Sequence, residues 1–249
     1  MPRNDDLLEI IMLAGRYALS NMTSLFIGGI VMALSFAVIG LPFFLGYVTR
    51  CMREIVRGNG VLPEWDEIGQ MFVDGLRMAL IFVTYALLYL LVVAIPAIPV
   101  MVFSYLNMTI LLPISALLLV VTMGVAFALF AVVFFASWVL YASTGSVKKA
   151  IDVKKVAGFV RYNPAGFVVA IISSAIIAGI GLIVTTPGFL VAIISSATAT
   201  GIGFIVTALS LFVTIPWVLF TISVAVTFIY AKFYQDTAKL QPSMVEWLR

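Results

Sequence analysis

The side chains that could carry out chemistry are concentrated in two short charged segments of an otherwise apolar chain. The first segment, residues 46–77, contains nine of the 25 charged residues. Its basic group comes first and consists of Arg50, Arg53 and Arg57. Its carboxylates are Glu54 and, further along, Glu64, Asp66, Glu67 and Asp74. The second segment, residues 145–163, contains five basic residues and one acid, namely Lys148, Lys149, Lys154, Lys155, Arg161 and Asp152.

The basic residues have the chemistry to bind phosphate oxygens. Spacings of three and four residues place the three arginines on one face of a helix. Basic clusters beside membrane helices attract acidic lipid by about 1 kcal/mol per residue. Ordinary orientation of the chain in the membrane is the alternative reading of the same residues. The candidate contacts for a lipid headgroup or a phosphate ligand are therefore Arg50, Arg53, Arg57, Lys148, Lys149, Lys154 and Lys155.

The remaining reactive groups do not assemble into a catalytic pattern. The chain has no histidine, which removes the commonest metal ligand and the usual general base. Its single cysteine, Cys51, lies among arginines that favour a thiolate, but we interpret it as a spectator. The carboxylates could bind a divalent cation or act in catalysis, although a solvated acidic face near Arg77 explains them equally well. We expect no catalytic residues, no metal site and no cofactor.

Composition places the protein in a membrane. Hydrophobic residues make up 63% of the chain and charged residues 10%, whereas about a quarter of a soluble domain is charged. No charged residue occurs in 17–49, 78–147 or 162–231. Since about 20 apolar residues span the hydrocarbon as a helix, the first run predicts one crossing and each longer run at least two. The predicted fold class is all-α, a polytopic transmembrane helix bundle.

We expect a single integral membrane domain over residues 1–249. It begins with an amphipathic helix at 1–20 and a first span at 22–48, bent near Gly40 and Pro42. A re-entrant hairpin that breaks near Gly40 is the alternative for this span. The rest of the chain is expected to be a loop at 50–77, spans 2 and 3 within 78–143, a loop at 145–163, spans 4 and 5 within 165–231, and a tail at 232–249.

A tandem repeat in the final apolar run allows two different numbers of spans. Residues 169–185 recur as 191–207, with 13 of 17 positions identical at an offset of 22 residues. Twenty-two residues rise about 33 Å as a helix, which is one membrane crossing. The final apolar run therefore accommodates two long spans or three tightly linked ones, which gives five spans or six.

Both charged loops show helical periodicity of apolar residues. In the first loop, Gly58-Asn59-Gly60 is expected to end the helix that carries the arginines. Pro63 is expected to begin a separate amphipathic helix that lies on the membrane surface. Its apolar stripe is Ile68, Phe72, Val73 and Leu76. The second loop predicts another interfacial helix, with Ile151, Val153, Val156, Phe159 and Val160 on its apolar side.

The distribution of basic residues predicts the orientation. With five spans, both charged loops and the tail lie on the same side, which then carries 12 of the 14 Lys and Arg residues. The positive-inside rule assigns that side to the cytoplasm of a multi-pass protein of the cell membrane. A sixth span moves only the tail to the other side.

The sequence of the first loop resembles an uncharacterised family of prokaryotic, notably archaeal, membrane proteins, domain of unknown function 4013. The matching positions in this loop are Gly46, Tyr47, Arg50, Arg53, Arg57, Gly58, Leu62, Pro63, Glu64, Asp66, Phe72, Asp74, Gly75 and Leu76. Ile151-Asp152, Val156 and Asn163-Pro164 are similar to the second cytoplasmic segment of that family. The resemblance implies a multi-pass membrane protein without an established activity. The final apolar run is longer than the family pattern by about one repeat unit.

Two functional hypotheses follow. The first is a non-enzymatic scaffold or assembly factor whose basic amphipathic loops contact anionic lipid or partner proteins, with homo-oligomers included. The second is a transporter, channel or lipid-translocating protein that uses the Ser-, Thr- and Gly-rich helices of 165–231. No nucleic-acid partner is expected, because the basic residues lie beside apolar runs and no nucleic-acid-binding motif accompanies them.

Overall fold

All the regular secondary structure in the described part of the chain is helical, which confirms the predicted fold class. The computed structural model describes residues 4–197, 214–240 and 244. The helices are α1 (Asn4–Ala18), α2 (Met22–Ser35), α3 (Leu41–Val56), α4 (Ile68–Tyr105), α5 (Leu111–Thr144), α6 (Val147–Ile151), α7 (Val153–Tyr162), α8 (Pro164–Ala197) and α10 (Ile215–Leu240).

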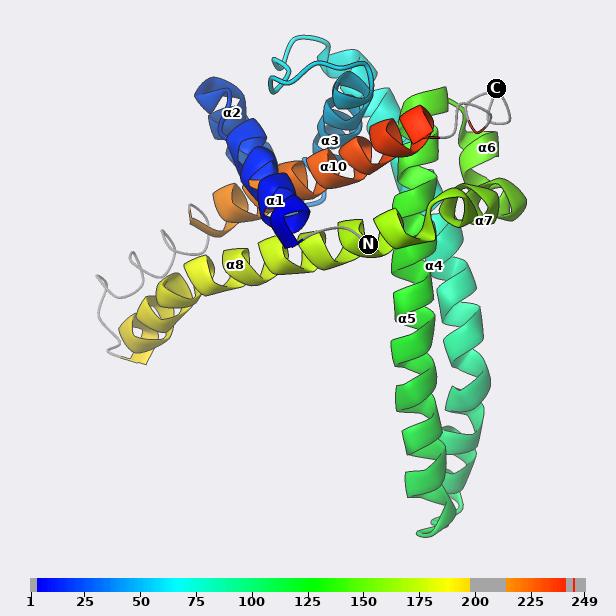
Figure 1. Ribbon diagram of the computed structural model, residues 1–249. Coiled ribbons are helices and arrows are strands. Elements are labelled where there is room, and N and C mark those ends of the chain that lie inside the picture. The colour runs from blue at the N-terminus through cyan, green and yellow to red at the C-terminus, as the bar shows by residue number, and fades with distance from the viewer. Residues whose placement is uncertain (1–3, 198–213, 241–243, 245–249) are drawn as a thin grey trace.

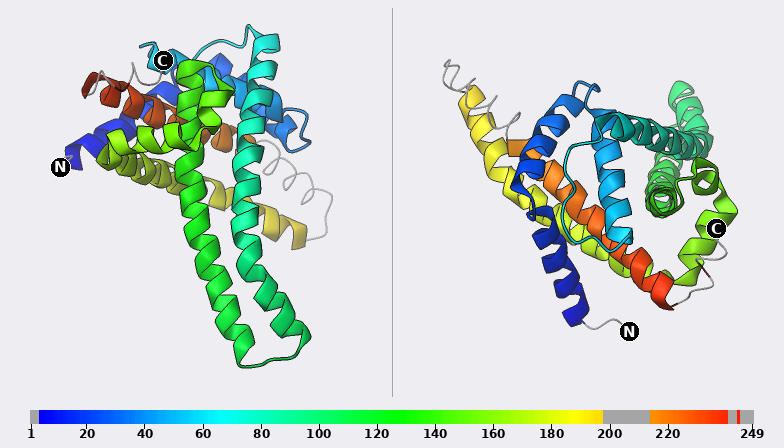
Figure 2. Two further views of the ribbon diagram at one scale, coloured as in Figure 1. Left: turned by 90° about the vertical axis from the view of Figure 1, so that its right-hand side faces the viewer. Right: turned by 90° about the horizontal axis from the view of Figure 1, so that it is seen from above.

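Two pairs of long helices set the shape of the molecule. Helices α4 and α5 form an antiparallel hairpin that extends well beyond the other helices (Figure 1). Helices α8 and α10 pack on each other and run across the hairpin near one end, so that a view along α5 shows them lengthwise (Figure 2). Helix α3 contacts α4, α5 and α10 and thereby joins the two pairs.

Within the described residues, four helices are long and apolar enough to cross a membrane. They are Ile68–Tyr105, Leu111–Thr144, Pro164–Thr186 and Ile215–Lys239. A fifth crossing is reached if α1 and α2 count as one span bent by 85°. The second copy of the tandem repeat lies largely outside the described residues, and so does most of the tail beyond 240. The choice between five and six spans therefore stays open.

The segment expected to form span 1 contains two helices. Helix α2 ends at Ser35 and α3 begins at Leu41, with turns over residues 36–40 between them. Pro42 lies in the first turn of α3, where its missing N–H leaves no hydrogen bond unmade. The break falls beside Gly40, where both readings of the sequence placed a bend. How this segment lies in the membrane stays a prediction.

The prediction of a separate surface helix after Pro63 was wrong. Residues 61–67 are not helical, and α4 runs without interruption from Ile68 to Tyr105. The apolar stripe assigned to the surface helix therefore lies in the first turns of the helix that continues into span 2. Nothing between Leu76 and Ala79 could end a helix, since neither glycine nor proline occurs there.

The second charged loop forms two short capped helices between α5 and α8. Gly145 ends α5 in the left-handed conformation at φ 66°. The Ser146 side chain accepts a hydrogen bond from the backbone N–H of Lys149 at the start of α6. Asp152 does the same for Lys154 and Lys155 at the start of α7. Both helices pack against α5, and α6 also contacts α4.

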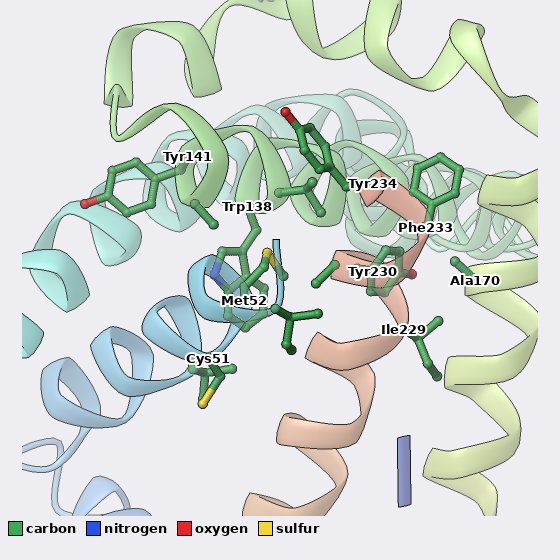
Figure 3. Close-up of a cluster of buried hydrophobic side chains, with 14 of the residues drawn as sticks. Cys51, Met52, Trp138, Tyr141, Ala170, Ile229, Tyr230, Phe233 and Tyr234 are labelled. Carbon is green, nitrogen blue, oxygen red and sulfur yellow. The ribbon is translucent and has the colours of Figure 1, made fainter. Parts of the chain in front are cut away.

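The core is built around α3. Tyr47, Val48, Cys51 and Met52 on this helix are all inaccessible to solvent. Figure 3 shows Met52 of α3, Trp138 of α5 and Tyr230 of α10 within one cluster of buried side chains. The Trp138 indole donates a hydrogen bond of 3.0 Å to the Thr49 hydroxyl. Buried aromatic side chains therefore link α3 to both helix pairs.

Helices α3 and α4 approach each other through two glycines. A Cβ atom on Gly46 would lie 1.8 Å from the Met71 carbonyl oxygen. A Cβ atom on Gly75 would lie 1.7 Å from the Pro42 carbonyl oxygen. Because each obstructing atom belongs to the backbone, no side-chain movement could make room. Only glycine fits at these two positions.

We expect Gly46→Ala and Gly75→Ala each to destabilise the protein by about 2–3 kcal/mol, because the two helices must separate. In thermal unfolding of the detergent-solubilised protein, this corresponds to a Tm lower by about 5–10 °C. Gly124→Ala in α5 is the matched control, since its added methyl group meets open space. The control should be neutral or slightly stabilising. Equal Tm values for all three variants would contradict the close approach.

Candidate functional site at the charged end of α3 and α4

A polar cavity opens between α3 and α4 just beyond the glycine contact. Its volume is about 330 Å³. Three arginines of α3 line it, namely Arg50, Arg53 and Arg57, as the sequence spacing predicted. Three carboxylates also line it, namely Glu54, Glu67 and Asp74. The charges in the cavity wall therefore balance.

Each arginine of this group already has a carboxylate partner within the chain. Arg50 pairs with Asp66, Arg53 with Asp74 at 3.0 Å, and Arg57 with Glu54 at 2.8 Å. The hydrogen bond from Arg50 lowers the pKa of the Asp66 carboxyl from its usual value. Satisfied guanidinium groups attract an external anion less than free ones do. The arrangement is that of a structural ion-pair network.

Asp74 is the centre of this network. Its side chain is only 6% exposed. One carboxylate oxygen accepts a hydrogen bond from Arg53 at 3.0 Å, and the other accepts one from the Tyr141 hydroxyl at 2.7 Å. Arg77 lies 3.6 Å from the second oxygen. A single buried carboxylate therefore ties α3 and α5 to α4, a role that sequence reasoning missed.

Residues 58–67 form a strap that is fixed to α2 and α3. The Trp65 ring stacks on Tyr47 with centroids 3.9 Å apart, and its indole N–H donates to the Ser24 carbonyl at 3.0 Å. The Pro63 carbonyl accepts hydrogen bonds of 2.8 Å from the hydroxyls of both Ser24 and Tyr47. These contacts hold the strap in an extended form and explain why Pro63 does not begin a helix.

The four candidate lysines lie elsewhere, on α6 and α7. None of them lines the arginine cavity. Lys148 and Lys154 are exposed, and Lys149 and Lys155 are half-buried. The inner side of α7 is apolar and buried through Val156 and Phe159. The structure therefore divides the predicted basic site into an arginine group and a lysine group.

The lysine group differs from the arginine group in its counter-charges. Within the described residues, Lys148, Lys154, Lys155 and Arg161 form no ion pair with a carboxylate. Asp152, the acid of this segment, accepts hydrogen bonds from the backbone N–H groups of Lys154 and Lys155 as a helix cap. The positive charge of Lys148, Lys154, Lys155 and Arg161 is therefore available to an external anion.

Cys51 is fully buried in the core rather than exposed among the arginines. Burial raises the pKa of its thiol to about 12. The thiolate that arginines close in the sequence would favour therefore does not form near neutral pH, in agreement with the interpretation of Cys51 as a spectator. Among the described residues, no group of three or more His, Cys, Asp or Glu residues is placed to hold a metal ion.

These features define the class of the molecule as an all-helical membrane protein with four candidate spans and a charged end built on α3 and α4. A family model described as "Protein of unknown function (DUF4013)" matches residues 31–189, which is more than half of the chain. The chain belongs to this family. No curated protein and no solved structure matches it.

Removal of the Asp74 carboxylate should destabilise the protein strongly. Asp74→Ala leaves Arg53 and Tyr141 without their partner in a largely buried place, which costs about 3 kcal/mol or more. We expect a fall in Tm of about 10 °C. Asp66→Ala is the matched control, because Asp66 is 59% exposed and its pair with Arg50 lies at the surface. The control should lose less than about 1 kcal/mol. Similar losses for both variants would show that Asp74 is not the centre of the network.

The Cys51 thiol should be unreactive in the folded protein. We expect negligible labelling by a maleimide at pH 7.5, because the thiol is protonated and covered. Complete labelling should follow denaturation. Mass spectrometry gives the readout directly, since the chain has a single cysteine. A variant with Gly60→Cys, in the exposed part of the strap, is the positive control for the folded state. Rapid labelling of native Cys51 would contradict its burial.

Proposed function

We propose that the protein is a non-enzymatic, multi-pass protein of the cell membrane whose charged end faces the cytoplasm and contacts anionic lipid headgroups through α6 and α7. In this role it acts as a scaffold or assembly factor for partner proteins or for further copies of itself. The observation that carries the proposal is the contrast between the two basic groups. Arg50, Arg53 and Arg57 are each paired with a carboxylate, whereas Lys148, Lys154 and Lys155 have no ion-pair partner among the residues that the structure describes.

The position of α6 and α7 supports this proposal. Both helices pack against α5 near the end of the hairpin where the charged segments lie (Figure 1). From there the hairpin continues as an uncharged apolar stretch from Met78 to Val147. Basic residues at the edge of such a stretch lie at the depth of phosphate headgroups in a bilayer.

The bonding of the polar groups supports a non-catalytic role. Both oxygens of Asp74 already accept hydrogen bonds, one from Arg53 and the other from Tyr141, which suits a structural role better than that of a general base. The transport alternative depended on hydroxyls of the Ser- and Thr-rich helices. In α8, Ser174, Thr185 and Thr186 instead donate hydrogen bonds to carbonyls of their own helix. We therefore favour the scaffold over the transporter.

A variant with Lys148→Ala, Lys154→Ala and Lys155→Ala tests the proposal. Each lysine near the surface contributes about 1 kcal/mol of attraction to acidic lipid, or roughly a fivefold change in affinity. The measurement is the Tm of the detergent-solubilised protein during titration with phosphatidylglycerol or phosphatidylcholine. Wild-type protein should be stabilised more by phosphatidylglycerol, because a ligand that binds the folded state raises its stability. The triple variant should lose this difference.

Arg57→Ala is the control for general loss of positive charge. Arg57 is 63% exposed, but it is paired with Glu54 within its own helix. This variant should keep the wild-type preference for phosphatidylglycerol. A triple lysine variant that still prefers phosphatidylglycerol would refute the proposed contact.

A further inference from the structure

An apolar groove lies between α4 and α5, beside the start of α7. Its volume is about 210 Å³. The walls include Leu88 and Tyr89 of α4 with Ala126, Leu129 and Phe130 of α5, and Val153 of α7 borders it. The lining residues recur at three and four positions along both helices, so the groove follows the hairpin for about 10 Å. Its direction is therefore that of the predicted spans.

Two basic residues of α7 come directly after the groove residue Val153 in the sequence. Val153 is the first residue of α7, and Lys154 and Lys155 follow it immediately. The hydroxyl of Tyr85, another residue of the groove, donates a buried hydrogen bond of 2.8 Å to the Ala150 carbonyl. This bond fixes α6 against α4. The basic residues are thus held at a set position relative to the apolar walls.

The groove also offers a polar group part of the way along. Tyr89 is half-buried in its wall, and its ring contacts Phe127 and Phe130. Its hydroxyl makes no hydrogen bond to any residue that the structure describes. A half-buried donor beside apolar walls suits an ester carbonyl. Along α4, the groove residues therefore run from Tyr85, which is bonded to α6, through Tyr89 to Val92.

We propose that this groove is a binding site for one anionic phospholipid. An acyl chain lies between α4 and α5, the phosphate lies at Lys154 and Lys155, and the Tyr89 hydroxyl donates to an ester carbonyl. The charge at the border selects an anionic lipid over a zwitterionic one, and the apolar walls select a lipid over free phosphate. This inference deepens the proposed lipid contact, on which it rests, by giving that contact a defined site.

The test is a count of lipid molecules that stay bound after purification. Protein is equilibrated with equal amounts of phosphatidylglycerol and phosphatidylcholine in mild detergent, and the retained lipid is counted by native mass spectrometry. Wild-type protein should retain one phosphatidylglycerol in preference to phosphatidylcholine. Ala126→Phe, which fills the groove from α5, should reduce retention at least tenfold. Ala128→Phe, two positions along and exposed outside the groove, is the matched control and should behave as wild type.

Leu88→Trp repeats the obstruction from the facing wall, so that a folding defect in one variant does not decide the result. Inorganic phosphate, added in large excess, should not displace the lipid. Equal retention by Ala126→Phe and Ala128→Phe overturns the groove, even if the triple lysine variant loses its preference for phosphatidylglycerol. That pair of results would leave a diffuse contact at α6 and α7. Equal retention of both lipids by the wild type overturns the headgroup assignment.

Discussion

The backbone contact between α3 and α4 is the constraint on which the other features of the charged end depend. Gly46 and Gly75 let the two helices touch, and this contact fixes their register along each other. In that register Arg53 meets Asp74, and the Asp74 carboxylate faces Tyr141 of α5. A side chain at either glycine would move the ion pair apart. The ion pair between Arg53 and Asp74 thus depends on the close backbone contact at the two glycines.

The arginine group and the lysine group show that the number of charged residues alone does not reveal what those residues bind. Both groups fit the positive-inside pattern, and both lie beside apolar helices. Arg50, Arg53 and Arg57 are paired with carboxylates of the strap, of α4 and of α3 itself. Lys148, Lys154 and Lys155, in contrast, form no ion pair among the described residues. Whether a basic residue has a carboxylate partner in the folded chain therefore decides whether it belongs to a structural network or is a candidate ligand contact.

Much of the architecture could be predicted from the sequence, because uncharged runs of membrane length have few alternatives. The helical class, the long helices over 78–143 and the charged face that carries Arg50, Arg53 and Arg57 are of this kind. The start of α4 could not be predicted in this way. The Pro63 carbonyl accepts hydrogen bonds from the hydroxyls of Ser24 and Tyr47, which are distant in the sequence.

The role of Asp74 could not be predicted from the sequence either, because its partner Tyr141 lies 67 residues further along the chain. Its buried environment arises only when α3, α4 and α5 come together. The burial of Cys51 has the same origin, since Arg50 and Arg53 lie close to it in the sequence while its own side chain lies in the hydrophobic core. Local pattern identified the helices, whereas tertiary contacts decided what each polar group does.

The continuity of α4 has a mechanical consequence. From Asp74 to Tyr105 this helix extends for about 46 Å. A tilt of one degree about the Gly75 contact would displace its far end by about 0.8 Å, as a lever would. The hairpin tip is therefore coupled in position to the ion-pair network, even though no residue of the tip touches it.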